Sequence, residues 1–119
     1  MKSNVVQDKS YQFSIRIINL YKFLKNDKHE YVLSEQILRC GTPVGANIEE
    51  AIGGISKKDF IANLQISYKE ARESHYWLRL LKDTEYIDEN MFQSLITDCE
   101  EILKLLSKIL ETSKLNLQK

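Results

Sequence analysis

The sequence predicts an all-α protein, an antiparallel up-and-down bundle of four helices with a kinked second helix. In four segments, apolar residues recur at spacings of three and four, the period of an amphipathic helix. Only four glycines and one proline interrupt the 119 residues, which favours long helices joined by short connections. We expect one domain over residues 1–119, with helices at about 8–26, 32–53, 57–83 and 89–112.

The composition limits the classes of protein to which the chain can belong. Hydrophobic residues make up 43% and charged residues 29%, as in ordinary folded domains. No apolar run is long enough to cross a membrane or resembles a secretory signal, so we expect a cytoplasmic protein without membrane contact. The 17 basic and 17 acidic residues cancel, whereas proteins that bind nucleic acid mainly through its phosphates carry a basic excess.

The first predicted helix, residues 8–26, has an apolar face and charges that suit the helix dipole. Asp8 lies near its start, and lysines lie in its last turns. Basic residues outnumber acidic ones in residues 1–30, which makes this helix a candidate basic patch, although a solvated helix face is the simpler interpretation. His29 in the following connection has no cysteine or second histidine nearby, so we expect it on the surface.

The second predicted helix, residues 32–53, combines an apolar stripe with Gly41, Gly45 and Pro43. Glycine inside a helix costs up to about 1 kcal/mol relative to alanine, so we expect a neighbouring backbone to approach these two glycines closely. Pro43 removes a backbone donor and either kinks a continuous helix or begins a new one with Thr42 as its cap. We favour the kinked continuous helix.

The third predicted helix has the clearest start. Gly53 and Gly54 end the preceding helix, and Ser56 and Asp59 have the spacing of a capping box. One apolar stripe of this helix includes His75. Because no acidic partner or metal ligand accompanies it in the sequence, we expect a hydrogen-bonded histidine in the core.

The opposite side of the third helix carries a second apolar stripe. A helix that is apolar on two faces is buried on two sides, so this stripe predicts contact between copies of the protein. The alternative is that Trp77 folds back over the connection at Tyr86 and Ile87, since single apolar side chains often lie on surfaces. The candidates for the subunit interface are Ala62, Ile66, Glu73, Trp77 and Leu80.

Asp88 can cap the last helix, in which apolar residues repeat over nearly three heptads. The polar residues 112–119 are expected to fray. Cys40 and Cys99 each fall on an apolar stripe, where a free thiol behaves as a small hydrophobe, so we expect both to be buried, reduced and inert.

The sequence contains no recognisable catalytic or cofactor-binding pattern. A di-metal site in a helical bundle needs two Glu-x-x-His pairs, and neither His29 nor His75 follows a glutamate at that spacing. Glu49 and Glu50 diverge by about 100 degrees around a helix, so they do not face one substrate. We therefore expect no cofactor, no metal and no enzymatic activity.

Arg39, Asn47 and Glu50 lie at the edge of the apolar stripe of the second helix. Arg39 and Glu50 are eleven residues apart, about 16 Å along a helix, and cannot pair with each other. We predict a structural role with an interaction function. Arg39 is expected to pair with Glu73, or with another acid, across a helix or subunit boundary, because guanidinium and carboxylate groups match in bidentate pairs.

A series of residues through the second and third helices carries a family resemblance. The series consists of Gln36, Arg39, Val44, Asn47, Ile48, Glu50, Lys58, Asp59, Phe60, Leu64, Glu73, Trp77, Leu78, Leu80 and Leu81. Over roughly residues 10–110, the chain resembles the bacterial four-helix-bundle family named after proteins encoded in 23S ribosomal RNA intervening sequences.

The resemblance implies an up-and-down bundle that assembles as a ring-like homopentamer, as the characterised members do. A related accessory protein of diversity-generating retroelements is a basic pentamer that engages a reverse transcriptase and nucleic acid. The family at large has no established activity, and the resemblance implies none. This chain departs from the pattern at Pro43, where a small or hydroxyl residue is usual, and differs from the retroelement protein in its neutral net charge.

These observations predict a non-enzymatic homo-oligomer, a pentamer, that serves as a scaffold or adaptor for another macromolecule. The alternative function is that of an RNA- or DNA-binding accessory protein. An enzyme is the third choice and would require a pocket between subunits that the sequence does not indicate. The candidate nucleic-acid contacts of the alternative function are Arg16, Lys22, Lys25, Lys57 and Lys58.

Overall fold

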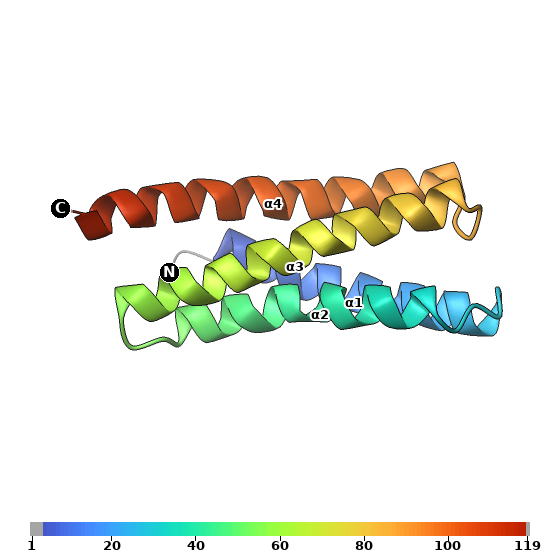
Figure 1. The fold of residues 1–119 in the computed structure, drawn as a ribbon, viewed down its shortest axis with the longest axis horizontal. Helices are drawn as coiled ribbons and strands as arrows, with labels where there is room; N and C mark the ends of the chain where they lie inside the picture. The colour runs from blue at the N-terminus through green and yellow to red at the C-terminus, as the bar shows by residue number, and fades with distance from the viewer. Residues whose placement is uncertain (1–3, 119) are drawn as a thin grey trace.

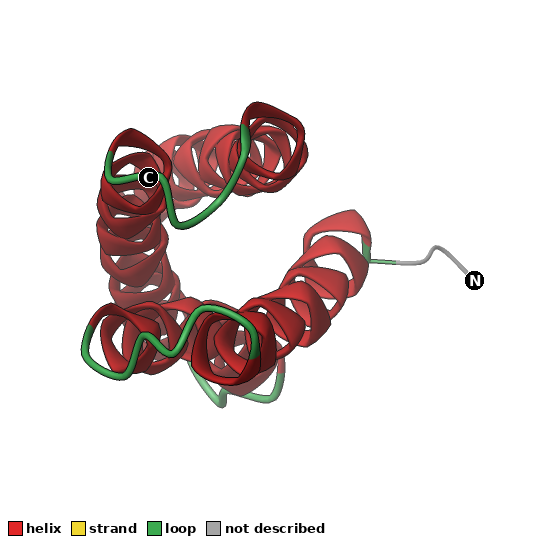
Figure 2. Cartoon of the chain, turned by 90° about the vertical axis from the view of Figure 1, so that its right-hand side faces the viewer, coloured by secondary structure: helices red, strands yellow, loops and turns green. Residues whose placement is uncertain are grey.

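The computed structural model describes residues 4–118, and in that range it contains four α-helices and no strand. The helices run alternately up and down in a molecule of 51 × 27 × 21 Å, and each packs against the next, while α1 also meets α4 (Figure 1). Short loops join the helices at their ends (Figure 2). The predicted all-α four-helix bundle is confirmed. Its helices are α1 (Val5–Asn26), α2 (Leu33–Ile52), α3 (Lys57–Asp83) and α4 (Glu89–Gln118).

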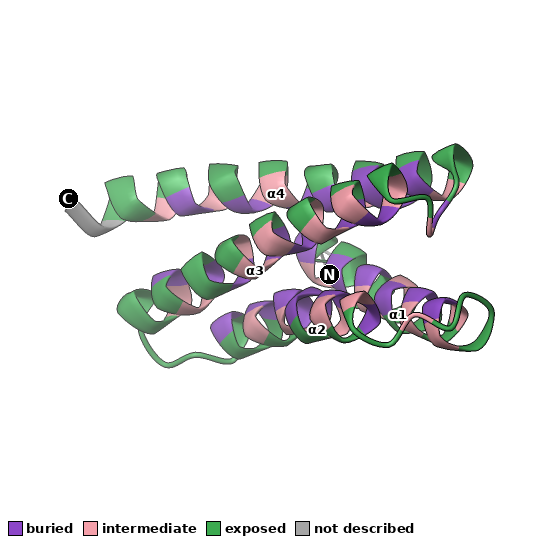
Figure 3. Cartoon of the chain, turned by 45° about the vertical axis from the view of Figure 1, so that its right-hand side comes forward, coloured by how far each residue is buried: buried purple, intermediate pink, exposed green. Residues whose placement is uncertain are grey.

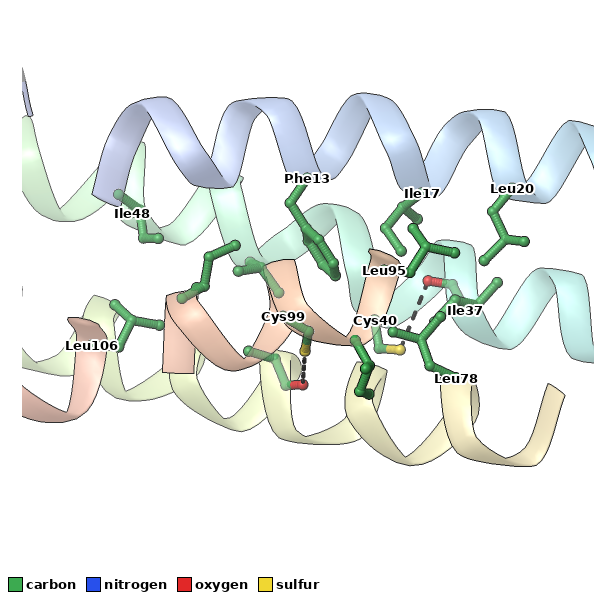
Figure 4. Packing of buried hydrophobic residues seen from close by; sticks show 14 of the residues in the cluster. Phe13, Ile17, Leu20, Ile37, Cys40, Ile48, Leu78, Leu95, Cys99 and Leu106 are labelled. Carbon is green, nitrogen blue, oxygen red and sulfur yellow. Dashed lines mark hydrogen bonds between the residues drawn. The ribbon is translucent and has the colours of Figure 1, made fainter. Parts of the chain in front are cut away.

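The apolar faces of the four helices meet in one core. Buried residues face the interior and exposed residues face solvent along each helix, as the 3.6-residue period requires (Figure 3). Side chains from all four helices interdigitate in the centre of the bundle (Figure 4). Fully buried members of this cluster include Phe13, Ile17, Ile48, Leu78 and Leu106.

Side-chain caps fix the starts of α1 and α3. The Asn4 side chain accepts a hydrogen bond from the Gln7 backbone N–H at 3.0 Å, so α1 begins at Val5, three residues before the predicted start. Ser56 Oγ accepts from the Asp59 N–H at 3.1 Å, and α3 has the limits that the sequence predicts. Asp88 Oδ1 accepts from the Met91 N–H at 2.8 Å at the start of α4, as predicted, so these three helices begin where a polar side chain satisfies a free backbone donor.

The predicted end of the last helix at residue 112 is wrong. α4 continues to Gln118, through residues that were expected to fray. No glycine or proline occurs in this stretch, and polar residues such as Lys114 and Gln118 are good helix formers, so nothing in the chain stops the helix.

α2 is continuous through Pro43, so the alternative in which Thr42 caps a new helix is wrong. The Thr42 hydroxyl instead donates to the Leu38 carbonyl oxygen at 2.9 Å. Asn47 Nδ2 donates to the Pro43 carbonyl oxygen, also at 2.9 Å. Side-chain hydrogen bonds to the backbone therefore accompany the proline on both sides. The kink of this helix stays a prediction.

Gly41 and Gly45 lie where α1 and α2 come closest. A Cβ atom on Gly41 would lie 2.7 Å from Ile17 Cγ2. On Gly45 it would lie 2.9 Å from Ser14 Oγ and 3.2 Å from the backbone oxygen of Ser10. The expected close approach of a neighbouring backbone is confirmed at Gly45, whereas at Gly41 the nearest atoms belong to the Ile17 side chain.

We predict that Gly41→Ala lowers the free energy of unfolding by about 1–3 kcal/mol, because the new methyl group would overpack the buried Ile17. Helix propensity alone predicts the opposite sign. Urea unfolding followed by circular dichroism, at one fixed protein concentration, measures the change.

The matched control is Gly53→Ala. At Gly53 the nearest atom to a new Cβ is the Glu49 carbonyl oxygen at 3.6 Å, an ordinary contact, so this variant should unfold within about 0.5 kcal/mol of the parent protein. Equal destabilisation of both variants would contradict the packing explanation.

Candidate functional site

Buried serines set the register of α2 and α3. Ser67 Oγ donates to the Val44 carbonyl oxygen at 2.7 Å. Ser74 Oγ donates to the Glu70 carbonyl oxygen of its own helix at 2.8 Å and lies 3.4 Å from Cys40 Sγ. Both serine side chains are fully buried. A serine is small enough to let two helices approach, and its hydroxyl must find a partner there. These contacts align the outer edges of the two antiparallel helices.

At that outer edge, four side chains form a network that we call the Arg39 network. The Arg39 guanidinium forms an ion pair with the Glu73 carboxylate. Arg39 Nη2 also donates to Gln36 Oε1 at 2.9 Å. Trp77 Nε1 donates to Glu73 Oε2 at 3.0 Å. The predicted pairing of Arg39 with Glu73 is confirmed, across the boundary between two helices of one chain.

The hydrogen bond from the Trp77 indole, followed by the hydrogen bond and charge of Arg39, lowers the pKa of the Glu73 carboxyl below its usual range. Glu73 is therefore ionised at neutral pH. The Arg39 side chain is 54% exposed, so water screens the ion pair and its contribution to stability is small. The network orients its side chains more than it stabilises the fold.

The structure places the five interface candidates at different depths. Ala62 is exposed, and the Ile66 side chain is 46% exposed. Trp77 and Leu80 are half-buried, as is Glu73. Trp77 packs edge-on against Tyr76, with 5.2 Å between the ring centroids, and its N–H is directed back along α3 to Glu73, away from the connection at residues 86–87.

The structure does not bring Asn47 and Glu50 into the Arg39 network. The Asn47 amide is engaged by the carbonyl of Pro43, and the Glu50 side chain is exposed further along α2. Arg39, the outer edge of α2 and the second stripe of α3 nevertheless lie on one side of the bundle, because Arg39 joins the two helices. We call this side the α2–α3 face and define it by Arg39, Glu50, Ile66, Glu73 and Trp77.

A second exposed apolar surface lies on α1, and the sequence analysis did not identify it. Tyr11 is 61% exposed, Ile15 41% and Ile18 39%. Their spacing of four and three places them on one side of the helix, and Lys22 continues the row one turn later. We call these four residues the α1 outer face. A search for a second stripe on every helix, as on α3, would have found it.

The five candidate nucleic-acid contacts do not form one patch in the single chain. Arg16 contacts α4, where its Nη1 lies 2.5 Å from Asp98 Oδ2. Lys22 and Lys25 lie near the end of α1, whereas the start of α3 with residues 57–58 lies at the other end of the bundle (Figure 1).

The expected core position of His75 is wrong. His75 Nε2 lies 3.1 Å from Glu100 Oε2 on α4, and the His75 side chain is 24% exposed. The residue stands at the border of the apolar stripe, on the side that faces α4, and α4 supplies the acidic partner that the local sequence lacks. His75 therefore lines a surface groove between α3 and α4.

The cysteines are buried, as predicted. Burial raises the pKa of Cys40 to about 11 and that of Cys99 to about 12. Cys99 Sγ contacts the Ala71 carbonyl oxygen at 3.3 Å (Figure 4). Over residues 4–118, no three histidine, cysteine or acidic side chains gather as metal ligands, and no helix there has the length and apolarity needed to span a membrane.

Comparison with known proteins agrees with this fold. The family model described as 23S rRNA-intervening sequence protein matches residues 2–108. A solved structure of a protein of unknown function from the S23 ribosomal protein family of Bacteroides thetaiotaomicron VPI-5482 is 54% identical to the chain. The match covers 93% of this chain and 99% of that one, with a TM-score of 0.90. No curated protein matches the chain.

We predict that the indole N–H resonance of Trp77, the only tryptophan, reports the titration of Glu73. Its midpoint should lie below about pH 4.3, the ordinary glutamate value, and Arg39→Ala should raise it. Because the folded-state pKa of Glu73 is lowered, its contribution to stability is fully present above the ordinary glutamate pKa of about 4.3. That contribution is lost as the pH falls through the folded-state pKa.

Two-dimensional NMR between pH 7 and pH 2 gives the midpoints, with Lys58→Ala as a control that removes a cation at the start of α3. An indole titration at the ordinary glutamate value, unaffected by Arg39→Ala, would contradict the network.

We also predict that an aromatic disulfide reagent reacts with neither cysteine of the folded protein at pH 8. In about 8 M urea, which unfolds the protein, the reagent should react with both cysteines. Burial keeps both groups as thiols, whereas the thiolate is the nucleophile. Absorbance of the released thiolate measures the reaction, and rapid labelling of the folded protein would refute the assignment.

Proposed function

The chain belongs to the family of 23S rRNA-intervening sequence proteins, and we propose that it is a non-enzymatic, cytoplasmic homo-oligomer, a pentamer, that serves as a scaffold or adaptor for another macromolecule. The observation that supports self-association is the exposure of apolar side chains on two separate sides of the bundle. Contiguous apolar surface of this kind marks sites of protein contact in a folded chain.

The α2–α3 face has the composition of a contact surface. It presents Ile66 beside the half-buried Trp77 and the Arg39 network. Tryptophan and arginine are enriched among the residues that contribute most to binding energy. Because Trp77 and Arg39 are already held by Glu73, little conformational freedom remains to be lost when a partner binds.

The α1 outer face points in a different direction. α1 and α3 occupy opposite corners of the bundle, and each of them packs against both α2 and α4. A closed ring of more than two copies uses two different surfaces of each subunit, whereas a two-fold dimer uses one surface twice. Two separate apolar faces on one chain therefore support a ring.

The charges beside the two apolar faces are complementary. Lys22 follows the apolar residues of the α1 outer face, while the exposed Glu50 accompanies Ile66 on the α2–α3 face, where Glu73 is already paired with Arg39. Complementary charges at the border of an interface select the correct partner surface and orientation. We infer that the α1 outer face of one copy contacts the α2–α3 face of the next.

We predict that light scattering of the parent protein gives a mass near five times 13.9 kDa. Ile66→Glu and Ile15→Glu should each reduce it to about one copy, because each places a charge within one of the two faces. Leu115→Glu is the matched control: Leu115 is 56% exposed near the end of α4, outside both faces, and its replacement should leave the mass unchanged.

An equimolar mixture of the Ile66→Glu and Ile15→Glu proteins tests the pairing of the faces. The mixture retains one intact α1 outer face and one intact α2–α3 face, so it should form a complex of twice 13.9 kDa that neither variant forms alone. Circular dichroism verifies that each variant is helical. A parent protein that is a single copy at micromolar concentration would overturn the proposal.

A further inference from the structure

A groove of about 720 Å³ runs along the outer seam of α3 and α4, on the side of α3 that is turned away from the Arg39 network. Its volume lies in the range of ligand-binding clefts. Polar side chains from both helices line it, including His75 and Arg79 from α3 and Lys104 from α4. Nothing in the proposed self-association uses these residues.

Both carboxylates of the groove contact a neighbouring side chain, and Glu101 pairs with a lysine. Glu100 Oε2 lies 3.1 Å from His75 Nε2, and Glu101 Oε2 lies 2.6 Å from Lys9 Nζ on α1. The cationic side chains that line the groove form no ion pair within residues 4–118. These cationic side chains are Arg72, Arg79 and Lys104. Three cations and two carboxylates thus line the groove, and Lys9 engages one of the carboxylates, so a chain of zero net charge carries an excess of positive charge here.

The two arginines are placed on one side of α3. They are seven residues apart, two helical turns, which corresponds to about 10.5 Å along the axis. Arg79 Nε donates to the His75 carbonyl oxygen at 3.4 Å, and the guanidinium lies 5.8 Å from the centre of the Tyr76 ring. These contacts restrict Arg79 while its terminal N–H groups make no hydrogen bond within the described residues.

We propose that this groove binds a ligand that carries two or more phosphate groups, held by Arg72, Arg79 and Lys104. The planar guanidinium fork matches two phosphate oxygens, and an ammonium group adds a point charge from the facing helix. Tyr68 lines the same groove and supplies a neutral hydroxyl donor. Because the two arginines lie two turns apart, their long side chains can each hold a separate phosphate, and the ligand class is a nucleoside diphosphate or a short run of phosphodiester backbone.

Isothermal titration calorimetry at low salt tests the site, with ADP as one probe and a ten-nucleotide single-stranded oligothymidylate as the other. The parent protein should bind at least one probe, and the tighter probe identifies the source of the phosphates. Loss of charge-assisted hydrogen bonds should weaken binding by about tenfold or more in the Arg72→Ala/Arg79→Ala protein. Lys104→Ala should weaken it in the same direction from the α4 side.

The matched control is Lys28→Ala/Lys69→Ala. It removes two exposed cations that lie outside the groove, so binding should change by less than about threefold. Circular dichroism confirms that the variants remain helical. The proposal is overturned if the parent protein binds neither probe, if the groove variants bind as the parent does, or if the control loses as much affinity as the double-arginine variant.

Discussion

The close packing of α2 between α1 and α3 is the constraint on which the other features of the molecule depend. Toward α1, Gly41 and Gly45 leave no room for even one methyl group. Toward α3, the hydroxyl of Ser67 donates a buried hydrogen bond to the Val44 carbonyl oxygen of α2. Larger residues at these positions would separate the helices, and the edge contact between Arg39 and Glu73 would then open.

Pro43 is compatible with this packing because of where it lies on α2. A proline removes the N–H that would bind the carbonyl four residues earlier, which here belongs to Arg39. Arg39 is exposed, so water can satisfy that carbonyl. Hydrogen bonds from Thr42 to Leu38 and from Asn47 to Pro43 satisfy nearby carbonyls. The helix therefore tolerates the proline, and α2 remains continuous.

The sequence predicted the features that depend on local period and local chemistry. The helical period identified the buried faces, and glycines and capping residues located the limits of α3 within the chain. The pairing of Arg39 with Glu73 was predictable because the second stripe placed an acid at the border of α3 nearest α2. The polar composition after residue 112 predicted fraying. No glycine or proline occurs in residues 112–118, however, and α4 continues to Gln118.

Features that depend on how two helices face each other were not predictable from the apolar period of either helix alone. The contact of His75 with Glu100 joins residues 25 positions apart, and it exists only because α3 and α4 present those positions to one seam. The exposure of Tyr11 and Ile15 likewise depends on which sides of α1 are covered by α2 and α4. Periodicity identifies a face, but only packing decides whether another helix covers it.

The net charge of zero conceals an uneven distribution of charge, which the ion pairs explain. Glu101 is engaged by Lys9, and Asp98 is engaged by Arg16, so two acids of α4 serve to join α4 to α1. These pairs turn acidic side chains of α4 toward α1 and leave cations in excess where α4 meets α3. Since charges interact mainly within about 10 Å at ordinary ionic strength, the local excess governs binding more than the sum over the chain does.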